Sequence, residues 1–172
     1  MRRVRSFPPL EDRHARVLVL GSMPGAASLA AGQYYAHPRN HFWPIMGRLF
    51  GAGPDLPYAK RVRRLKSCGI AVWDVLESCV RPGSLDADIE ESSIAVNDFA
   101  RFFDAHPGIS AVFFNGAKAE SAYRRHVLKG LPPPACRLPV HRLPSTSPAH
   151  AALSLEGKLA AWEQLRDRTS VL

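Results

Sequence analysis

The sequence of 172 residues predicts an α/β fold, a three-layer sandwich in which a central four-stranded parallel sheet is flanked by helices. Four short and nearly unbroken apolar runs are typical of parallel strands that are covered on both faces. Between these runs the apolar residues recur at helical spacing, and strands that alternate with helices build right-handed βαβ units. The length suits a single domain over residues 1–172, in which residues 1–14 form a basic arm whose order the sequence leaves open.

Each predicted strand is followed by a glycine, a polar residue or a proline. The runs are residues 17–20 before Gly21, 70–73 before Asp74, 111–114 before Asn115 and 137–143 before Pro144. The last run is the weakest, because Pro139 has no N–H to donate to a neighbouring strand. Ligands of such folds bind beyond the carboxyl ends of the strands. The segments in which to look for a site are therefore residues 21–40, 74–84, 115–116 and 144–150.

Five other stretches have the apolar spacing of helices. The first two are expected near residues 42–49 and 58–65. Two more are expected over about 96–106 and 117–129, the second of which is stopped by a glycine and a run of prolines. The last helix is expected to begin with Ser154 as its N-cap.

Charge gives the first indication of a partner. Lysine and arginine outnumber aspartate and glutamate by 23 to 15, which gives a net charge of +8 at pH 7. A basic excess of this size favours a polyanion such as nucleic acid, because each neutralised phosphate releases condensed counterions. A basic protein with no nucleic-acid role is the alternative that charge leaves open.

Nothing in the sequence indicates a metal or an organic cofactor, and none is expected. Cys68, Cys79 and Cys136 lie far apart without a Cys-x-x-Cys pair, so neither a zinc site nor an iron–sulfur cluster is supported. Free thiols in a reducing compartment are the expected state. Residues 1–9 lack the apolar stretch of a signal peptide, and no apolar run is long enough to span a bilayer. We expect a cytoplasmic protein, associated with the nucleoid in a prokaryote.

The loop expected after the first strand carries two motifs. Residues 21–25 read Gly-Ser-Met-Pro-Gly, which permits close backbone approach to a ligand but by itself is more typical of a plain turn. The motif lacks the Gly-Lys-Ser/Thr of a Walker loop and the spacing of a dinucleotide fingerprint. Residues 34–43 read Tyr-Tyr-Ala-His-Pro-Arg-Asn-His-Phe-Trp, which is too aromatic and polar for a plain connection. Aromatic rings stack on bases, while arginine and histidine reach phosphates.

The loop expected after the fourth strand reads Leu-Pro-Ser-Thr-Ser-Pro-Ala-His at residues 143–150. Hydroxyls and small residues between prolines make a stiff segment whose side chains and N–H groups can hold phosphate oxygens. A proline-limited loop that only leads into the final helix is an equal alternative.

In this order the motifs resemble those of the uracil-DNA glycosylase superfamily, and most closely its hypoxanthine-DNA (deoxyinosine) glycosylase branch. Gly-Ile-Ala-Val-Trp-Asp-Val-Leu at residues 69–76 and Val-Phe-Phe-Asn-Gly at 112–116 extend the resemblance, which spans about residues 17–165. The resemblance implies a four-stranded parallel sheet with a base pocket at its carboxyl edge. It also implies a monofunctional glycosylase of base excision repair that hydrolyses the N-glycosidic bond of a flipped deaminated base, preferably hypoxanthine.

The resemblance implies that Asn40 is the catalytic residue. In the mismatch-specific uracil/thymine branch the third residue of the first motif is a catalytic asparagine, and other branches carry an acid nearby. That position here is Met23, which can neither orient water nor stabilise a cation. In the deoxyinosine branch catalysis is assigned to an asparagine that matches Asn40, whose amide oxygen would accept a hydrogen bond from the water that attacks C1′. Asn40 could instead cap the helix that begins near His41.

Other residues are expected at the base. Phe42 would stack on its face, Asp74 and Asn115 would bind its edge, and N–H groups near Ser22 and Met23 would stabilise the departing base anion. Phe42 could instead belong to the core, and Asp74 could be a buried hydrogen-bond anchor.

The remaining expected contacts are with DNA. The residues expected to bind it are Tyr35, His37, Arg39, Pro144, Ser145, Thr146 and Ser147. Of these, His37 is more typical of a structural residue than of a general acid.

Three other functions stay open. The first is a uracil- or thymine-mismatch glycosylase on the same fold, and the second is a catalytically silent binder of damaged DNA, which Met23 would suit. The third is a nucleotide-binding α/β module, which the missing phosphate-binding signatures disfavour. The expected partner is double-stranded DNA with a damaged base, bound by a monomer without a membrane or a metal.

Overall fold

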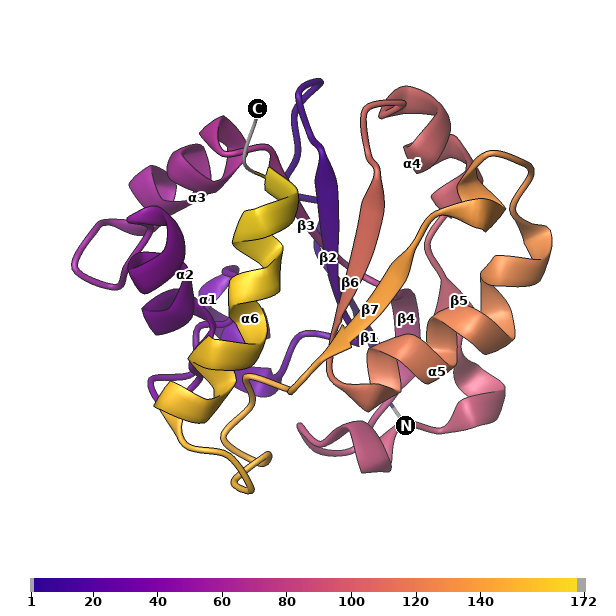
Figure 1. Cartoon of the computed structure of the whole chain (residues 1–172). Helices are drawn as coiled ribbons and strands as arrows, with labels where there is room; N and C mark the ends of the chain where they lie inside the picture. The colour runs from indigo at the N-terminus through magenta and orange to yellow at the C-terminus, as the bar shows by residue number, and fades with distance from the viewer. Residues whose placement is uncertain (1, 170–172) are drawn as a thin grey trace.

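The centre of the structure is a four-stranded parallel sheet, as the sequence predicts. The computed structural model describes residues 2–169, and residues 1 and 170–172 of the predicted domain lie outside this range. The strand order is β3-β2-β6-β7. The strands are β2 (Val17–Gly21), β3 (Ile70–Asp74), β6 (Ala111–Asn115) and β7 (Val140–Leu143). Every neighbouring pair is parallel, so the carboxyl ends of the strands meet at one edge (Figure 1).

Helices cover both faces of this sheet, which completes the three layers (Figure 1). On one face lie α2 (Phe42–Phe50), α3 (Tyr58–Ser67) and α6 (Leu155–Thr169), and on the other α4 (Phe99–Ala105) and α5 (Ala117–His126). Successive strand residues point to opposite faces. Val17 and Val19 therefore pack in the core under α2 and α6, whereas Leu18 and Leu20 pack in the core under α4 and α5. A strand that is covered on both sides needs an unbroken apolar run.

The predicted positions of α2 and α3 are confirmed, but the helix expected over residues 96–106 is shorter. It begins at Phe99, because Ala95–Val96 form strand β5 instead. The Asp98 carboxylate caps α4 by accepting a hydrogen bond from the Arg101 N–H. Val96, which periodicity alone assigned to the helix, therefore belongs to a strand.

The later elements also differ from their predicted bounds. Helix α5 ends at His126, and a 3₁₀ turn over Leu128–Gly130 replaces its expected last turn. Strand β7 begins only at Val140, because Ala135–Arg137 form another 3₁₀ turn. The predicted start of α6 is confirmed, since Ser154 Oγ accepts a hydrogen bond from the Gly157 N–H.

A second sheet, which the sequence did not predict, includes the basic arm. It is three-stranded and antiparallel, with β1 (Arg3–Arg5) paired to β4 (Leu76–Val80) and β4 paired to β5. Further along the arm, Leu10 forms an isolated bridge with Val72 of β3. The described part of the arm is thus tied to the folded domain, a point that the sequence left open.

Candidate active site

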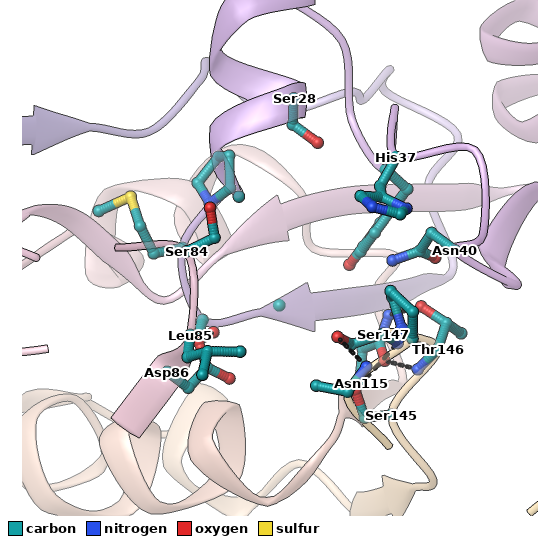
Figure 2. A pocket seen from close by; sticks show the side chains of 18 of the residues that line it. Ser28, His37, Asn40, Ser84, Leu85, Asp86, Asn115, Ser145, Thr146 and Ser147 are labelled. Carbon is teal, nitrogen blue, oxygen red and sulfur yellow. Dashed lines mark hydrogen bonds between the residues drawn. The ribbon is translucent and has the colours of Figure 1, made fainter. Parts of the chain in front are cut away.

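A cavity of about 720 Å³ opens at the carboxyl edge of the parallel sheet. Its volume falls within the roughly 300–1,000 Å³ that small-ligand sites occupy. Residues after β2, β3, β6 and β7 all contribute to its walls, as the fold predicts. Figure 2 shows His37 and Asn40 on one side of the cavity and Leu85 and Asp86 on the opposite side.

The cavity brings together most of the residues that the sequence singled out. Those that line it are Ser22, Met23, Tyr35, His37, Arg39, Asn40, Asp74, Asn115, Ser145, Thr146 and Ser147. They come from segments far apart in the chain, and the parallel order of the strands places these segments at one edge. Phe42 and Pro144 are the two exceptions.

The structure corrects the expected role of Phe42. Its side chain is 0% exposed and lies in the core with Trp43 and Trp162, both of which contact the ring edge-on. Its face stacks on Tyr35, with ring centroids 4.1 Å apart. Phe42 therefore has no face available to a base, and the helix places it in the core because it begins the buried stripe of α2.

Tyr34 and Tyr35 both line the cavity, and of the two Tyr35 is the less buried. It is the one non-glycine residue of the described chain with a positive φ, 54°, a conformation that costs energy for an L side chain. Stacking on Phe42 helps to hold it there. Burial raises the pKa of the Tyr35 hydroxyl, so this group is neutral. Its hydroxyl oxygen is buried and has no hydrogen-bond partner within residues 2–169.

Pro144, which the sequence predicts to contact DNA, is the second exception. It does not line the cavity, and its carbonyl accepts a hydrogen bond from Trp162 Nε1 of α6 at 2.9 Å. The residues that follow do line the cavity, in a loop held by side chain–backbone hydrogen bonds. Ser145 Oγ accepts from the Ser147 N–H, and Ser147 Oγ accepts from the Ala149 N–H. The stiff loop that the prolines predicted is present, but its first residue faces the helix.

Asn40 both lines the cavity and caps helix α2. Its Oδ1 accepts a hydrogen bond from the Phe42 N–H at 2.9 Å, which fixes the orientation of the amide because only the oxygen can accept. The amide nitrogen then faces the cavity, as Figure 2 shows. Oδ1 keeps a second lone pair, so capping leaves both amide atoms able to bind a further group.

Asn115 links β6 to the loop after β7. Its Oδ1 accepts from the Thr146 N–H, and its Nδ2 donates to Thr146 Oγ1, both at 2.9 Å (Figure 2). The Thr146 carbonyl in turn accepts from the His41 N–H. Because Thr146 is fully buried, this pair fixes the position of the whole loop relative to the start of α2. One donor hydrogen and one acceptor lone pair of Asn115 remain for a ligand.

Two carboxyl groups, Asp74 and Asp86, border the cavity. Asp74 is 3% exposed, and its Oδ2 is buried without a hydrogen-bond partner in the described chain. Burial, and to a lesser extent the charge of Asp86, raises the pKa of Asp74 from 3.8 to about 7. Burial also raises the pKa of Asp86, which accepts a hydrogen bond from Ser22 Oγ at 2.6 Å.

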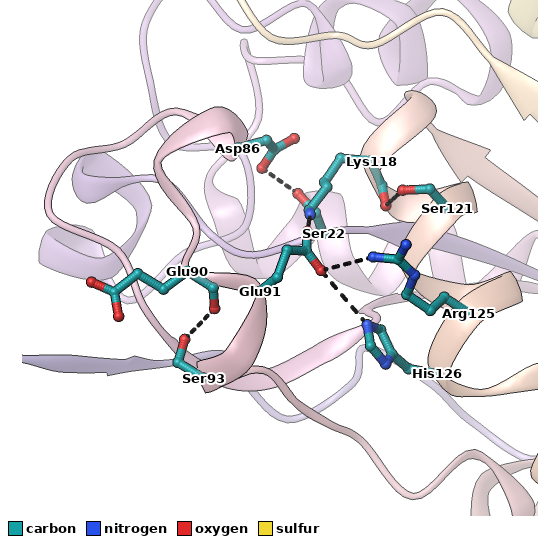
Figure 3. Close-up of polar contacts among 9 residues, drawn as sticks. All are labelled: Ser22, Asp86, Glu90, Glu91, Ser93, Lys118, Ser121, Arg125 and His126. Carbon is teal, nitrogen blue, oxygen red and sulfur yellow. Dashed lines mark hydrogen bonds and ion pairs between the residues drawn. The ribbon is translucent and has the colours of Figure 1, made fainter.

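The segment that carries Asp86 is held at several points (Figure 3). Near its start, Ser84 Oγ accepts from the Ala26 N–H, and the Ser22–Asp86 hydrogen bond follows. Near its end, Glu91 pairs with Lys118 of α5, which lowers the pKa of Glu91. Arg125 and His126 of α5 also lie within 3.7 Å of this carboxylate. Such anchoring keeps Asp86 fixed at the cavity wall.

Two residues of this region, Asp86 and Lys158, were not predicted from the sequence. Asp86 lies just beyond residues 74–84, the segment selected because it follows a predicted strand. The one signal in the sequence that could have indicated Asp86 is the cluster of acidic residues over 86–91 in an otherwise basic protein. Lys158 is 1% exposed, and its Nζ donates to the Ser147 carbonyl beneath the loop. Burial lowers the pKa of Lys158. It lies three residues after Leu155 and four before Trp162, so helical spacing could have placed it on the buried face.

The buried carboxyl group leads to a prediction about stability. Because the folded state raises the pKa of Asp74 to about 7, the native protein binds its proton more tightly than the unfolded chain does. The free energy of unfolding therefore falls as the pH rises from about 4 to 7, and this loss persists above pH 7. Asp74→Asn removes the titration, so the stability of the variant relative to the wild type should rise by roughly 2–4 kcal/mol between pH 4.5 and pH 8.

Urea unfolding at the two pH values measures this difference. Asp104→Asn, at an exposed position of α4, is the matched control and should show no such change. A difference between Asp74→Asn and wild type that is the same at both pH values would contradict the prediction.

Metal-binding groups and membrane-spanning helices are both absent from residues 2–169. No group of three or more His, Cys, Asp or Glu side chains in this range is arranged to hold a metal ion. No helix in the same range has the length and apolar character needed to cross a bilayer.

Comparison with known proteins identifies relatives of the chain. Residues 8–166 match the family described as the uracil DNA glycosylase superfamily. Proteins named hypoxanthine DNA glycosylase from Methanosarcina barkeri and Methanosarcina acetivorans are each 37% identical over 116 residues, 67% of this chain and 72% of theirs. The solution NMR structure of a candidate uracil DNA glycosylase from M. acetivorans is similar, with a TM-score of 0.80 and 31% identity. That match covers 98% of this chain and 99% of the other.

Proposed function

The chain belongs to the uracil-DNA glycosylase superfamily, and from this premise we propose that it excises hypoxanthine from DNA that contains deoxyinosine. The protein is a DNA glycosylase of repair, a hydrolase that cleaves the N-glycosidic bonds of deaminated bases. Hypoxanthine as the preferred base is supported by the 37% identity to proteins named hypoxanthine DNA glycosylase.

One observation of the cavity carries the proposal. Met23, in the first motif, is 7% exposed and packs in the core while it lines the cavity, so this wall offers an apolar side chain. A thioether cannot orient an attacking water through a strong hydrogen bond. Of the two asparagines that line the cavity, Asn115 is bound to Thr146 through both of its amide atoms, so we assign this role to Asn40, from the other half of the same loop as Met23.

The proposed reaction begins with base flipping. Unstacking the damaged nucleotide costs a few kcal/mol, and this cost is smaller for a mispaired base. The everted base stacks on the ring of Tyr35, and its edge binds Asp74 and Asn115. The N–H groups of Ser22 and Met23 donate no hydrogen bond within the described chain, and they stabilise negative charge on the leaving base.

Hydrolysis then requires a water at C1′ of the sugar. The glycosidic bond lengthens toward an oxocarbenium-like transition state, as in other glycoside hydrolysis. Asn40 holds the water with the lone pair of Oδ1 that remains free and with its amide N–H groups. The flanking DNA is bound by the exposed Arg39, by His37, and by the loop that contains Ser145 and Ser147. The protein acts as a monomer in the cytoplasm, where the chromosome of a prokaryote lies.

A panel of duplexes that each contain one lesion tests the proposal. Hypoxanthine, xanthine, uracil and ethenocytosine are incubated with the enzyme in turn, and alkaline cleavage reports the abasic site. We expect single-turnover release of hypoxanthine to be at least about 10-fold faster than that of any other base, the order of discrimination that pocket contacts provide. Faster release of uracil would favour a uracil glycosylase, and steep salt-dependent binding without abasic product would favour a silent binder.

A further inference from the structure

Asp74 is a buried carboxyl group without a partner at the wall of a substrate cavity. It ends strand β3, is 3% exposed, and makes no side-chain hydrogen bond within residues 2–169, with Oδ2 fully buried. An ionised carboxylate that is buried without a hydrogen-bond donor is costly. The protonated form carries an O–H with no acceptor among the described residues, and Asp74 lines the cavity.

The neighbours of Asp74 favour the protonated form. Tyr34 and Tyr35 lie in the segment after α1 (Ala26–Ala31) and line the same cavity, and burial keeps both hydroxyls neutral by raising their pKa. Asp86 contributes a second acid from the opposite segment. Arg81 is the cation that acts on Asp74, but its Nε and Nη2 donate to the carbonyls of Gly83 and Pro24. No described base stands beside Asp74 to take its proton.

Gly21 leaves room for this carboxyl group. A Cβ at Gly21 would lie 2.5 Å from Asp74 Oδ1 and 2.9 Å from the Tyr35 hydroxyl, so any larger residue would displace one of them. Both groups therefore lie close to the end of β2, where only a glycine leaves room for them. An acid that donates a proton in a reaction needs a defined position near the substrate.

This inference rests on the proposed function, in which the departing base must be neutralised by a proton. When the bond between C1′ and N9 breaks, its electron pair stays on the purine, and a proton at a ring nitrogen offsets the charge. We propose that Asp74 is the general acid of the reaction, and that it donates its proton to a ring nitrogen of the departing base. Burial, and to a lesser extent the charge of Asp86, which Ser22 holds in place, favours the protonated form of Asp74 before this step.

The C1′–N9 bond breaks with both electrons on the base, and the Asp74 O–H proton moves to a ring nitrogen, leaving a carboxylate. Water forms the new C1′–O bond, and the proton that it loses returns to Asp74 through solvent. Neutral hypoxanthine and an abasic sugar are the products. The raised pKa of Asp74, about 7, suits an acid that works near neutral pH.

The test is the pH dependence of base release. Single-turnover rate constants are measured on a deoxyinosine duplex from pH 5 to pH 9 for wild type, Asp74→Asn, Asp74→Glu and Asp86→Asn. We expect the wild-type rate to fall about tenfold per pH unit above an inflection near neutrality, because the reactive form is protonated. Asp74→Asn should be at least about 100-fold slower at pH 6 and independent of pH, the usual contribution of general acid catalysis.

The other two variants identify the titrating group. Asp74→Glu should restore a slower but pH-dependent rate. Asp86→Asn should move the inflection to lower pH, because removing a neighbouring negative charge makes Asp74 ionise more readily. Urea unfolding and duplex binding are measured for every variant, since a structural role would change these without changing the inflection.

The possible results separate the role of Asp74 from the proposed function. A wild-type rate that does not vary with pH, or an Asp74→Asn variant that keeps the wild-type inflection, would show that the acid is not Asp74. If wild type releases hypoxanthine but Asp74→Asn releases it equally fast, only this inference is wrong. If wild type releases no hypoxanthine at any pH, the proposed function is wrong and the inference falls with it.

Discussion

Asn40→Ala is expected to slow release of hypoxanthine from a deoxyinosine duplex by at least about 100-fold, while duplex affinity changes little. The side chain lines the cavity and has free hydrogen-bonding capacity there, whereas the exposed Arg39 and the loop of Ser145 and Ser147 carry the proposed DNA contacts. Single-turnover kinetics and equilibrium binding separate the two effects. Full excision by this variant would remove Asn40 from catalysis.

The second role of Asn40 requires its own control. Because Oδ1 caps α2 through the Phe42 N–H, the alanine variant should also lose about 1 kcal/mol of stability. Asp98→Ala removes the corresponding cap of α4, outside the cavity, and should lose similar stability without losing activity. Asn40→Asp retains an oxygen for the Phe42 N–H but no amide donor, so we expect a stable and slow enzyme. If Asp98→Ala were as slow as Asn40→Ala, lost stability would explain both.

Phe42→Ala is expected to destabilise the protein by about 3–5 kcal/mol, because it removes a fully buried ring that three other aromatic rings contact. In thermal unfolding this loss should lower the Tm by roughly 6–20 °C for a chain of this size. Phe42→Leu keeps most of the buried volume, and we expect it to release hypoxanthine at nearly the wild-type rate. These outcomes are expected if Phe42 is a core residue. If its ring stacked on the base instead, Phe42→Leu would slow base release.

Tyr35→Leu is the complementary variant. Because Tyr35 borders the cavity, we expect this change to slow base release more than Phe42→Leu does. Phe113→Leu, a fully buried substitution in the same core cluster on β6, is the matched control for lost packing. A stable Phe42→Leu variant that no longer releases the base would contradict the arrangement, because it would mean that Phe42 contacts the substrate.

The sequence by itself determined where the site would lie. Unbroken apolar runs mark strands that are buried on both faces, and parallel strands end at one edge, so the residues after the runs had to meet there. Asn40, Asp74 and Asn115 were found by this rule, and they line one cavity. The rule works because the apolar periodicity that marks each strand is local in the sequence. In addition, the connections of βαβ units are almost always right-handed, which limits how the strands can be arranged.

Only the tertiary structure decided how side chains within these segments are used. Phe42 and Tyr35 are seven residues apart in one loop-to-helix segment, and packing against Trp162 of α6 determines which ring reaches the cavity. The Ser22–Asp86 hydrogen bond joins residues 64 apart, and the Asn115–Thr146 pair joins residues 31 apart. Periodicity tells which face of an element is buried, but not which distant segment covers it. That choice is made by long-range packing and hydrogen bonding, which no local pattern records.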